Sequence, residues 1–306
     1  MNEISLTQRN LLALVACLLW STAFIGIKAG LQYTTPFQFA GYRFMISGLI
    51  LLPFSYKSIR LFKSRPALIL RILLISFFNT FMLYAAFYYG ITILSGALTA
   101  ITVGSGPIIT ALLTHLYIRG DKMTMRKLVS LMCGFAGITI ISISRKPWQA
   151  AGLQQVIGIA IIVSGNLFSS IGNILVAKRT ADVPPLLLTS MQIFLGGFGL
   201  FILSVFVEGR PVILYPLPYY PALFWLAFIS AAAFGIWFSL LKIPGTRVSE
   251  LNIWKFIIPV GGALLSWLVL PDESPDAGTI SGMIFVGIGI IALNYSIAKE
   301  KAPAPT

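Results

Sequence analysis

Ten long apolar stretches dominate the sequence and decide what the chain can fold into. They cover about residues 11–31, 37–56, 71–91, 96–118, 127–144, 156–177, 185–207, 219–241, 248–270 and 277–298. A helix needs about 20 apolar residues to cross a bilayer, so each stretch is long enough for one crossing. With 57% hydrophobic and only 10% charged residues, a water-soluble fold has too little polar surface to cover the apolar side chains. The sequence therefore predicts an all-α integral membrane protein with ten transmembrane helices.

The basic residues are distributed unevenly between the loops on the two sides of this predicted bundle. If the N-terminus is cytoplasmic, sixteen Lys and Arg residues lie in inner segments and only three, Arg145, Lys146 and Arg210, lie in outer loops. Positive loops stay on the cytoplasmic side during insertion, so we predict that both termini are cytoplasmic. The net charge of +13 then reflects topology, and we expect no nucleic-acid partner. The predicted location is the inner (plasma) membrane, with the lipid bilayer as surroundings.

An internal repeat appears when the sequence is shifted along itself. A shift of 152 residues places Pro107 on Pro259 and Asp121 on Glu273, and shifts of 148 to 150 place Arg43 on Gln192 and Gly48 on Gly197. The halves are residues 1–148 and 149–306, with five predicted spans each. Because five is odd, the second half enters the membrane inverted relative to the first. Inverted repeats are the plan of many secondary transporters, in which both halves share one midplane site.

Four segments carry a resemblance to a known family. They are "LLWSTAFIGIK" in the first span, the second span with Arg43, "YIRGDKMTMRKLVSLMCGFAGITII" after the fourth span, and its echo "VLPDESPDAGTISGMIFVGIGIIAL". Together they resemble the EamA-type branch of the drug/metabolite transporter superfamily. The resemblance implies ten helices, a central cavity, and export or exchange of small metabolites such as amino acids. Where the family usually has glutamate after the fourth helix, this chain has Asp121.

Polar and aromatic side chains in the predicted spans are candidates for substrate binding. At about 1.5 Å of rise per residue, several polar groups lie roughly 12–15 Å from a membrane face. These are Trp20, Ser21, Asn79, Ser105 and Asn166. These side chains either form hydrogen bonds between packed helices or line a polar cavity. As a group they favour the interpretation as a polar cavity. Tyr84, Trp20 and Trp254 would offer aromatic faces to an apolar or cationic part of a substrate.

Glycine and proline interrupt the fourth and ninth spans at equivalent places. Gly104, Gly106 and Pro107 lie in the middle of the fourth span, and Pro259 gives the ninth span a matching break. Proline removes a backbone donor and glycine leaves the backbone open, so the segments either bend as gates or serve helix packing. Tyr88 is near the outer end of the third span, where a gate or an interfacial aromatic belt is expected.

Two cations lie inside predicted spans. Arg43 is about 9 Å below the outer face, so its side chain either reaches that interface, forms a structural pair or contacts substrate. Lys255 is about 10 Å from the inner face, and its repeat equivalent is the uncharged Val103. Substrate contact, structural pairing and a gate are open roles for Lys255. Substrate contact would imply a solute with an acidic group. Glu250 is five residues earlier, a poor spacing for a direct helical pair.

These features predict a secondary transporter, an exporter or exchanger of small polar metabolites with amino acids favoured, working by alternating access. The alternatives are a lipid or lipid-carrier flippase and a multidrug efflux protein. A proton-driven pump is disfavoured, because no carboxylate that could carry the proton lies deep in a span. We expect no enzyme, cofactor or metal site, since neither a His–acid pair nor a carboxylate cluster is visible. The oligomeric state is open, and a monomer is one of the options.

Overall fold

The computed structural model describes residues 5–56, 58, 67–94, 96–145, 152–180, 182–210, 214–269 and 275–301, and every regular element in them is helical. Nine described helical segments have the length and hydropathy needed to cross a membrane. A tenth apolar segment, Ala277–Leu293, is shorter than these nine. The prediction of an all-helical protein with many membrane spans is confirmed, and the tenth crossing stays a prediction. Lys57, Arg60, Lys63, Arg65, Lys146 and Glu273 lie outside the described residues.

The helices follow the ten predicted stretches in order. Their bounds are α1 Leu6–Ser21, α2 Ala23–Gly30, α3 Pro36–Ser55, α5 Ala67–Ser76, α6 Leu83–Ile93, α7 Gly96–Gly104, α8 Gly106–Tyr117, α9 Met125–Arg145, α10 Leu153–Arg179, α11 Pro185–Val207, α12 Tyr219–Leu241, α13 Val248–Ile253, α14 Ile257–Val269 and α15 Ala277–Lys301. A π-helix, Phe77–Met82, joins α5 to α6, and a 3₁₀ turn, Trp254–Phe256, joins α13 to α14. Four of the predicted spans are therefore interrupted: the first, third, fourth and ninth.

The interruptions have local causes, and some of these causes can be recognised in the sequence. The fourth span breaks at Ser105, between Gly104 and Gly106, and Pro107 takes the second position of α8. Proline fits the first turn of a helix because that N–H has no partner there anyway. In the ninth span the break is the 3₁₀ turn, and Pro259 follows it in the first turn of α14. The predicted matching breaks are thus present in both halves. The π-helix in the third span was not predicted.

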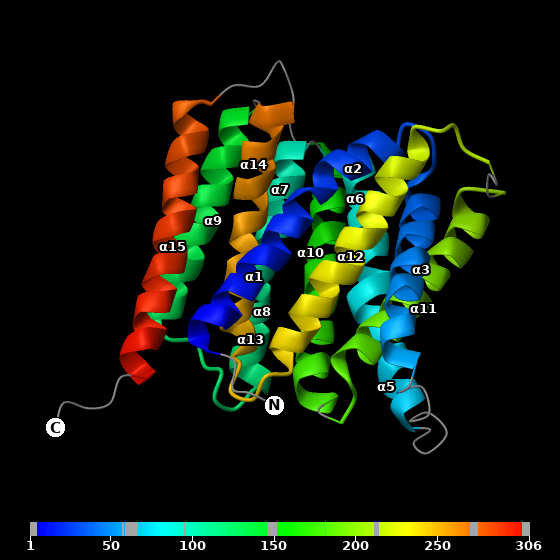
Figure 1. The fold of residues 1–306 in the computed structure, drawn as a ribbon. Helices are drawn as coiled ribbons and strands as arrows, with labels where there is room; N and C mark the ends of the chain where they lie inside the picture. The colour runs from blue at the N-terminus through cyan, green and yellow to red at the C-terminus, as the bar shows by residue number, and fades with distance from the viewer. Residues whose placement is uncertain are drawn as a thin grey trace.

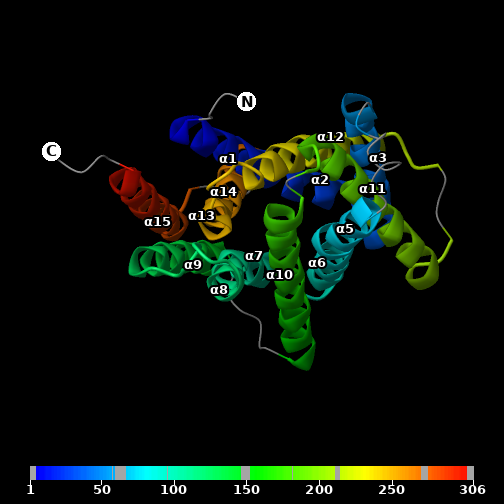
Figure 2. The same ribbon diagram turned by 90° about the horizontal axis from the view of Figure 1, so that it is seen from below.

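The helices form one bundle in which the two halves of the chain interlock (Figures 1 and 2). α9 lies beside α15 at one end, and α3 lies beside α11 at the other. Between these pairs, α1 packs on α12 and α14, while α10 packs on α6 and α8. α1 begins and α15 ends at the lower face of Figure 1, which we call the N-terminal face. Most neighbouring helices therefore come from different halves.

Glycines set the closest approaches between paired helices. A Cβ added to Gly282 on α15 would lie 2.6 Å from the backbone oxygen of Gly137 on α9, and one on Gly137 would lie 2.5 Å from the oxygen of Gly282. At the other pair, a Cβ on Gly48 of α3 would meet the backbone of α11, where Ser190 donates a hydrogen bond to the Gly48 oxygen. Small residues let membrane helices approach until their backbones touch, which replaces the hydrophobic driving force that lipid does not supply.

We predict that Gly282→Ala destabilises the protein, because the new methyl group would have to push α15 away from α9. Overpacking of this kind costs about 1–3 kcal/mol. The matched control is Gly287→Ala on the same helix, where an added Cβ meets no heavy atom within 4 Å. The control should be neutral or slightly stabilising, because alanine is the better helix former. Thermal midpoints of the purified variants in detergent provide the measurement, and equal midpoints for both would contradict the packing role of Gly282.

Candidate functional site

A cavity of about 180 Å³ lies in the middle of the bundle, between helices of both halves. This volume is below the roughly 300–1,000 Å³ of pockets that hold drug-sized molecules, so the cavity has the size for a small solute. The lining residues are Trp20, Ala23, Phe24, Ile27, Arg43, Asn79, Leu83, Tyr84, Phe87, Thr99, Ala100, Val103, Gly104, Gly106, Pro107, Thr110, Ile138, Asn166, Ser169, Ser170, Asn173, Phe234, Trp237, Lys255, Phe256, Ile258 and Pro259. Most of this surface is aromatic or aliphatic, and the polar groups are few.

The cavity brings together most of the residues that the sequence selected. Of the nine predicted substrate-binding residues, six line it: Trp20, Arg43, Asn79, Tyr84, Asn166 and Lys255. Of the five predicted gating residues, Gly104, Gly106, Pro107 and Pro259 line it. Their placement in one cavity is a structural fact, whereas binding and gating stay predictions.

Four predicted residues do not reach the cavity surface. Ser21 is buried, donates to the Cys17 oxygen and packs against Gly261 of α14. Trp254 borders a separate small pocket together with Arg9 and Glu250. Ser105 and Tyr88 lie behind the lining. Each accepts a hydrogen bond from a lining residue, Ser105 from Asn166 and Tyr88 from Arg43. For Ser21 the helix-packing alternative describes its surroundings best.

Asn166 of α10 covers the break in the fourth span. Its amide nitrogen donates to the backbone oxygen of Thr102 at 2.8 Å and to the Ser105 hydroxyl at 3.1 Å. Ser105 in turn donates to the Thr102 oxygen at 2.7 Å. Carbonyls freed by a helix break are costly in a membrane unless something pairs with them. The break is therefore stabilised by two side chains: Asn166 from the neighbouring α10 and Ser105 from the interrupted span itself.

A row of amides and hydroxyls missed by the sequence analysis continues along α10. Asn173 accepts from Asn79 at 3.4 Å and donates to Asn252 of α13 at 3.3 Å. Ser170 hydrogen-bonds to Thr110 of α8 at 2.7 Å. Asn173 is seven residues after Asn166, two helical turns along the same face, and this spacing was a usable signal. The row links α10 to the broken spans of both halves.

Arg43 is buried, with only 1% of its surface exposed, and its hydrogen-bonding partners are neutral. Its Nε donates to the Ser230 hydroxyl at 2.8 Å and its Nη1 donates to the Tyr88 hydroxyl at 3.2 Å. The guanidinium carbon also lies 4.7 Å from the ring centroid of Phe44. Because it points into the protein, Arg43 does not reach the membrane interface. Tyr88 is 0% exposed, so the belt alternative for this tyrosine is wrong.

Lys255 belongs to the 3₁₀ turn of the ninth span, and its ammonium lies over an aromatic ring. The Nζ atom is 4.9 Å from the ring centroid of Trp237, within the range of a cation–π interaction. Glu250, the nearest acid in sequence, is bound instead to Arg247 at 2.9 Å. Among the described residues, no carboxylate lines the cavity that Lys255 faces. No described carboxylate of the cavity lining therefore pairs with Lys255.

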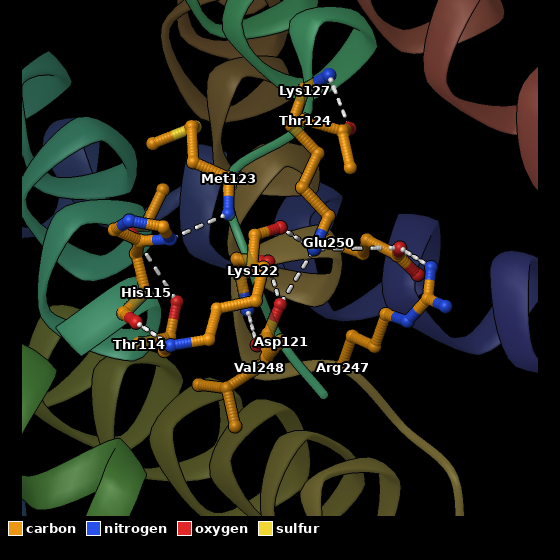
Figure 3. Close-up of polar contacts among 12 residues, drawn as sticks. Thr114, His115, Asp121, Lys122, Met123, Thr124, Lys127, Arg247, Val248 and Glu250 are labelled. Atoms are coloured by element: carbon orange, nitrogen blue, oxygen red, sulfur yellow. Dashed lines mark hydrogen bonds and ion pairs between the residues drawn. The ribbon is translucent and has the colours of Figure 1, made fainter. Parts of the chain in front are cut away.

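A largely buried ionic cluster at the N-terminal face joins the loop after the fourth span and the start of the fifth span to the start of the ninth span (Figure 3). We call it the Asp121 cluster; it consists of Asp121, Lys127, Arg247, Ser249 and Glu250. Lys127 Nζ lies 2.6 Å from Asp121 Oδ1 and 3.7 Å from Glu250 Oε1. The Asp121 carboxylate also accepts hydrogen bonds from the backbone N–H of Ser249, at 2.9 Å, and from its hydroxyl.

The position of Asp121 explains the acidic turn noted in the sequence. Gly120 has a φ of +95°, which turns the chain after α8 and directs Asp121 at the first turn of α13. A carboxylate there satisfies free N–H groups and faces the positive end of the helix dipole. His115 supports the same loop by accepting from the backbone N–H of Met123 at 3.0 Å.

Comparison with known proteins gives concordant matches. A profile described as the EamA-like transporter family matches residues 8–143 and again residues 156–295. "Uncharacterized transporter YvbV" of Bacillus subtilis is 25% identical, with 99% of this chain and 97% of that protein aligned. The "Probable amino-acid metabolite efflux pump" of Escherichia coli is 26% identical, over 96% of this chain and 97% of that protein. A solved structure called "Crystal structure of protein" has a TM-score of 0.77 at 16% identity, covers 95% of this chain and 99% of that one, and shares the fold.

We predict that Asp121→Asn lowers stability strongly, because it leaves the Lys127 ammonium, 3% exposed, without its closest counter-charge. Removing one partner of a buried ion pair costs about 3–5 kcal/mol. Asp182→Asn is the matched control, since Asp182 pairs with Arg71 at an exposed site and such pairs contribute about 0–1 kcal/mol. Thermal unfolding in detergent measures both. Similar shifts for the two variants would show that the Asp121 cluster does not hold the bundle together.

Proposed function

The chain belongs to the EamA-like transporter family, and from this premise we propose that it moves small polar metabolites by secondary transport through the central cavity. It is a multi-pass membrane transporter and not an enzyme, as its family and relatives are. The observation that carries the proposal is a small cavity between helices of both halves, with cations and amides among apolar walls. Amino acids are the favoured substrates, in line with the name of the Escherichia coli relative.

We further propose ten crossings arranged as two inverted repeats, residues 1–148 and 149–306. The packing pairs support this plan. α1 of the first half packs on α12 and α14 of the second, and α10 of the second packs on α6 and α8 of the first. Exchanging the halves converts one set of contacts into the other, as a pseudo-two-fold axis through the cavity requires. Two copies related in this way would open the site to one side and then to the other.

The interrupted spans supply the elements that such a motion needs. In the fourth span the break at Ser105 borders the cavity through Gly104, Gly106 and Pro107; in the ninth span the 3₁₀ turn borders it through Lys255 and Pro259. Hinges are commonly a few residues at element ends that absorb dihedral changes. The Asp121 cluster ties the loop that follows the fourth span to the start of the ninth span at the N-terminal face, so opening that face would require the cluster to part.

Two other transport functions are less consistent with the cavity. A proton-coupled multidrug pump would be expected to place a carboxylate in the binding site, and no described lining residue is acidic. A lipid flippase would need a lateral path for acyl chains, whereas the volume of about 180 Å³ suits a small solute. Uptake into proteoliposomes of radiolabelled amino acids, nucleosides, sugar phosphates and lipids tests these functions side by side. Strict dependence on added ATP would count against secondary transport.

We predict that both termini face the cytoplasm and that the protein is in the inner membrane. α1 begins and α15 ends at the same face of the bundle, which is consistent with an even number of crossings (Figure 1). A reporter that is active only in the cytoplasm should be active when fused after Thr306. A fusion of the same reporter in the outer loop, at Leu217, should be inactive. Activity of a periplasm-only reporter after Thr306 would rule out the ten-span topology.

We predict that Lys255→Gln folds normally but transports carboxylate-bearing solutes at least about tenfold more slowly, because the cation that attracts the carboxylate is lost. Lys255→Arg keeps the charge and should retain partial activity. Lys28→Gln is the matched control, since Lys28 is an exposed cation near the end of the first span. Initial rates of uptake into proteoliposomes give the comparison. An unchanged rate and affinity in Lys255→Gln would exclude substrate contact.

A further inference from the structure

We infer that the cavity is a two-position anion site, with Arg43 and Lys255 as its separate cationic ends, and that it selects solutes with a net negative charge. The inference deepens the proposed function and rests on it for the meaning of the site. It goes beyond a single contact at Lys255, because it states the charge of the whole solute and gives Arg43 a part. The solute class is a small dicarboxylic acid or an amino acid with an acidic side chain.

The first step is the charge of the lining. Arg43 and Lys255 both line the cavity, and no described lining residue is acidic. The hydrogen bonds of Arg43 go to the neutral hydroxyls of Ser230 and Tyr88, so no described ion pair cancels its charge. Lys255 likewise has no ion-pair partner in the described part of the chain. Two uncompensated cations in a low-dielectric space favour a solute whose net charge is negative over one whose net charge is positive.

The second step is the placement of the two cations. Arg43 is the eighth residue of α3, which begins at the face opposite the N-terminal face, and Lys255 is the eighth residue of the span that begins with α13 at the N-terminal face (Figure 1). At about 1.5 Å per residue, each lies about 10 Å along its span from its own face. The cations therefore approach the cavity from opposite sides of the membrane.

The third step is the wall between them. Ring contacts run without interruption from one cation to the other: the Arg43 guanidinium lies 5.9 Å from the ring of Tyr84, and Lys255 Nζ lies 4.9 Å from the ring of Trp237. Between these ends, Phe234 lies 6.3 Å from Tyr84 and Trp20 lies 5.3 Å from Phe234 and 5.2 Å from Trp237. An apolar carbon chain would lie along this wall while its two acidic ends face the two cations.

The test measures the charge preference of the cavity and requires no transport. Cysteine is placed at Ala100, a lining residue of α7, in a background with Cys133→Ser; Cys17 is 0% exposed and is kept. The reaction rates of an anionic and a cationic methanethiosulfonate of similar size are each divided by their rates with a free thiol. The anionic reagent should be favoured about tenfold or more at residue 100. At the exposed control, Leu217→Cys, the ratio should be near one.

Charge variants decide whether Arg43 and Lys255 cause this preference. Lys255→Gln and Arg43→Gln should each lower the ratio several-fold, whereas Arg43→Lys should preserve it. A ratio near one at residue 100 of the unaltered cavity, or a high ratio that both neutral variants leave unchanged, overturns the inference. If Arg43→Gln does not fold, Lys255→Gln and Arg43→Lys still separate the outcomes.

A second readout covers the case in which neither reagent reaches residue 100. Trp20 and Trp237 line the cavity, so iodide should quench their fluorescence more than caesium does, and Lys255→Gln should reduce the iodide effect. Equal iodide quenching before and after this substitution overturns the inference. A protein that prefers anions in both assays but transports none of the solutes tested would retain the anion site and refute the proposed transport function.

Discussion

The structure depends on one constraint: inside a bilayer, every backbone group that leaves a helix must find a partner within the protein. At the break in the fourth span, the Thr102 carbonyl accepts from the Asn166 amide and the Ser105 hydroxyl as well as from the Ser105 backbone N–H. The start of α13 is possible at a buried position because Asp121 accepts from the Ser249 N–H. Both solutions use a side chain from outside the interrupted span, so each interrupted helix is bonded to a neighbouring segment near the point where its own hydrogen bonding ends.

The same constraint explains which parts of the fold were predictable. Apolar runs identify membrane crossings because each helix forms the hydrogen bonds of its own backbone. The break at residues 104–107 was predictable from the glycines and the proline of the sequence Gly-Ser-Gly-Pro. The π-helix carries no comparable local signal. Its residues are ordinary helix residues, and Thr80 of this segment donates to Gln192 of α11, a contact between the two halves. Such a feature is set by tertiary packing, which one sequence does not reveal.

The candidate site follows the same division. Lys255 and Asn166 were found because a polar group in an apolar run is costly and therefore informative. Trp237 and Phe234 were missed because aromatic residues are common in membrane helices and their direction depends on helix rotation. Tyr88 was assigned by depth alone, whereas its place is fixed by the Arg43 guanidinium that donates to it. Depth along a helix is readable from sequence, but the face that a residue presents is not.

The internal repeat is not exact, and some equivalent positions of the two halves differ in charge. Under the 152-residue shift, Lys127 corresponds to Thr279 and Glu250 to Leu98. The Asp121 cluster therefore joins the loop after the fourth span to the start of the ninth span with buried charges at the N-terminal face, while two of the corresponding positions of the other copy are uncharged. Breaking charge pairs costs more than separating uncharged side chains when nothing replaces the lost partner. If the halves exchange conformations, the states closed at the two faces consequently differ in free energy, and this charged copy favours closure at the N-terminal face.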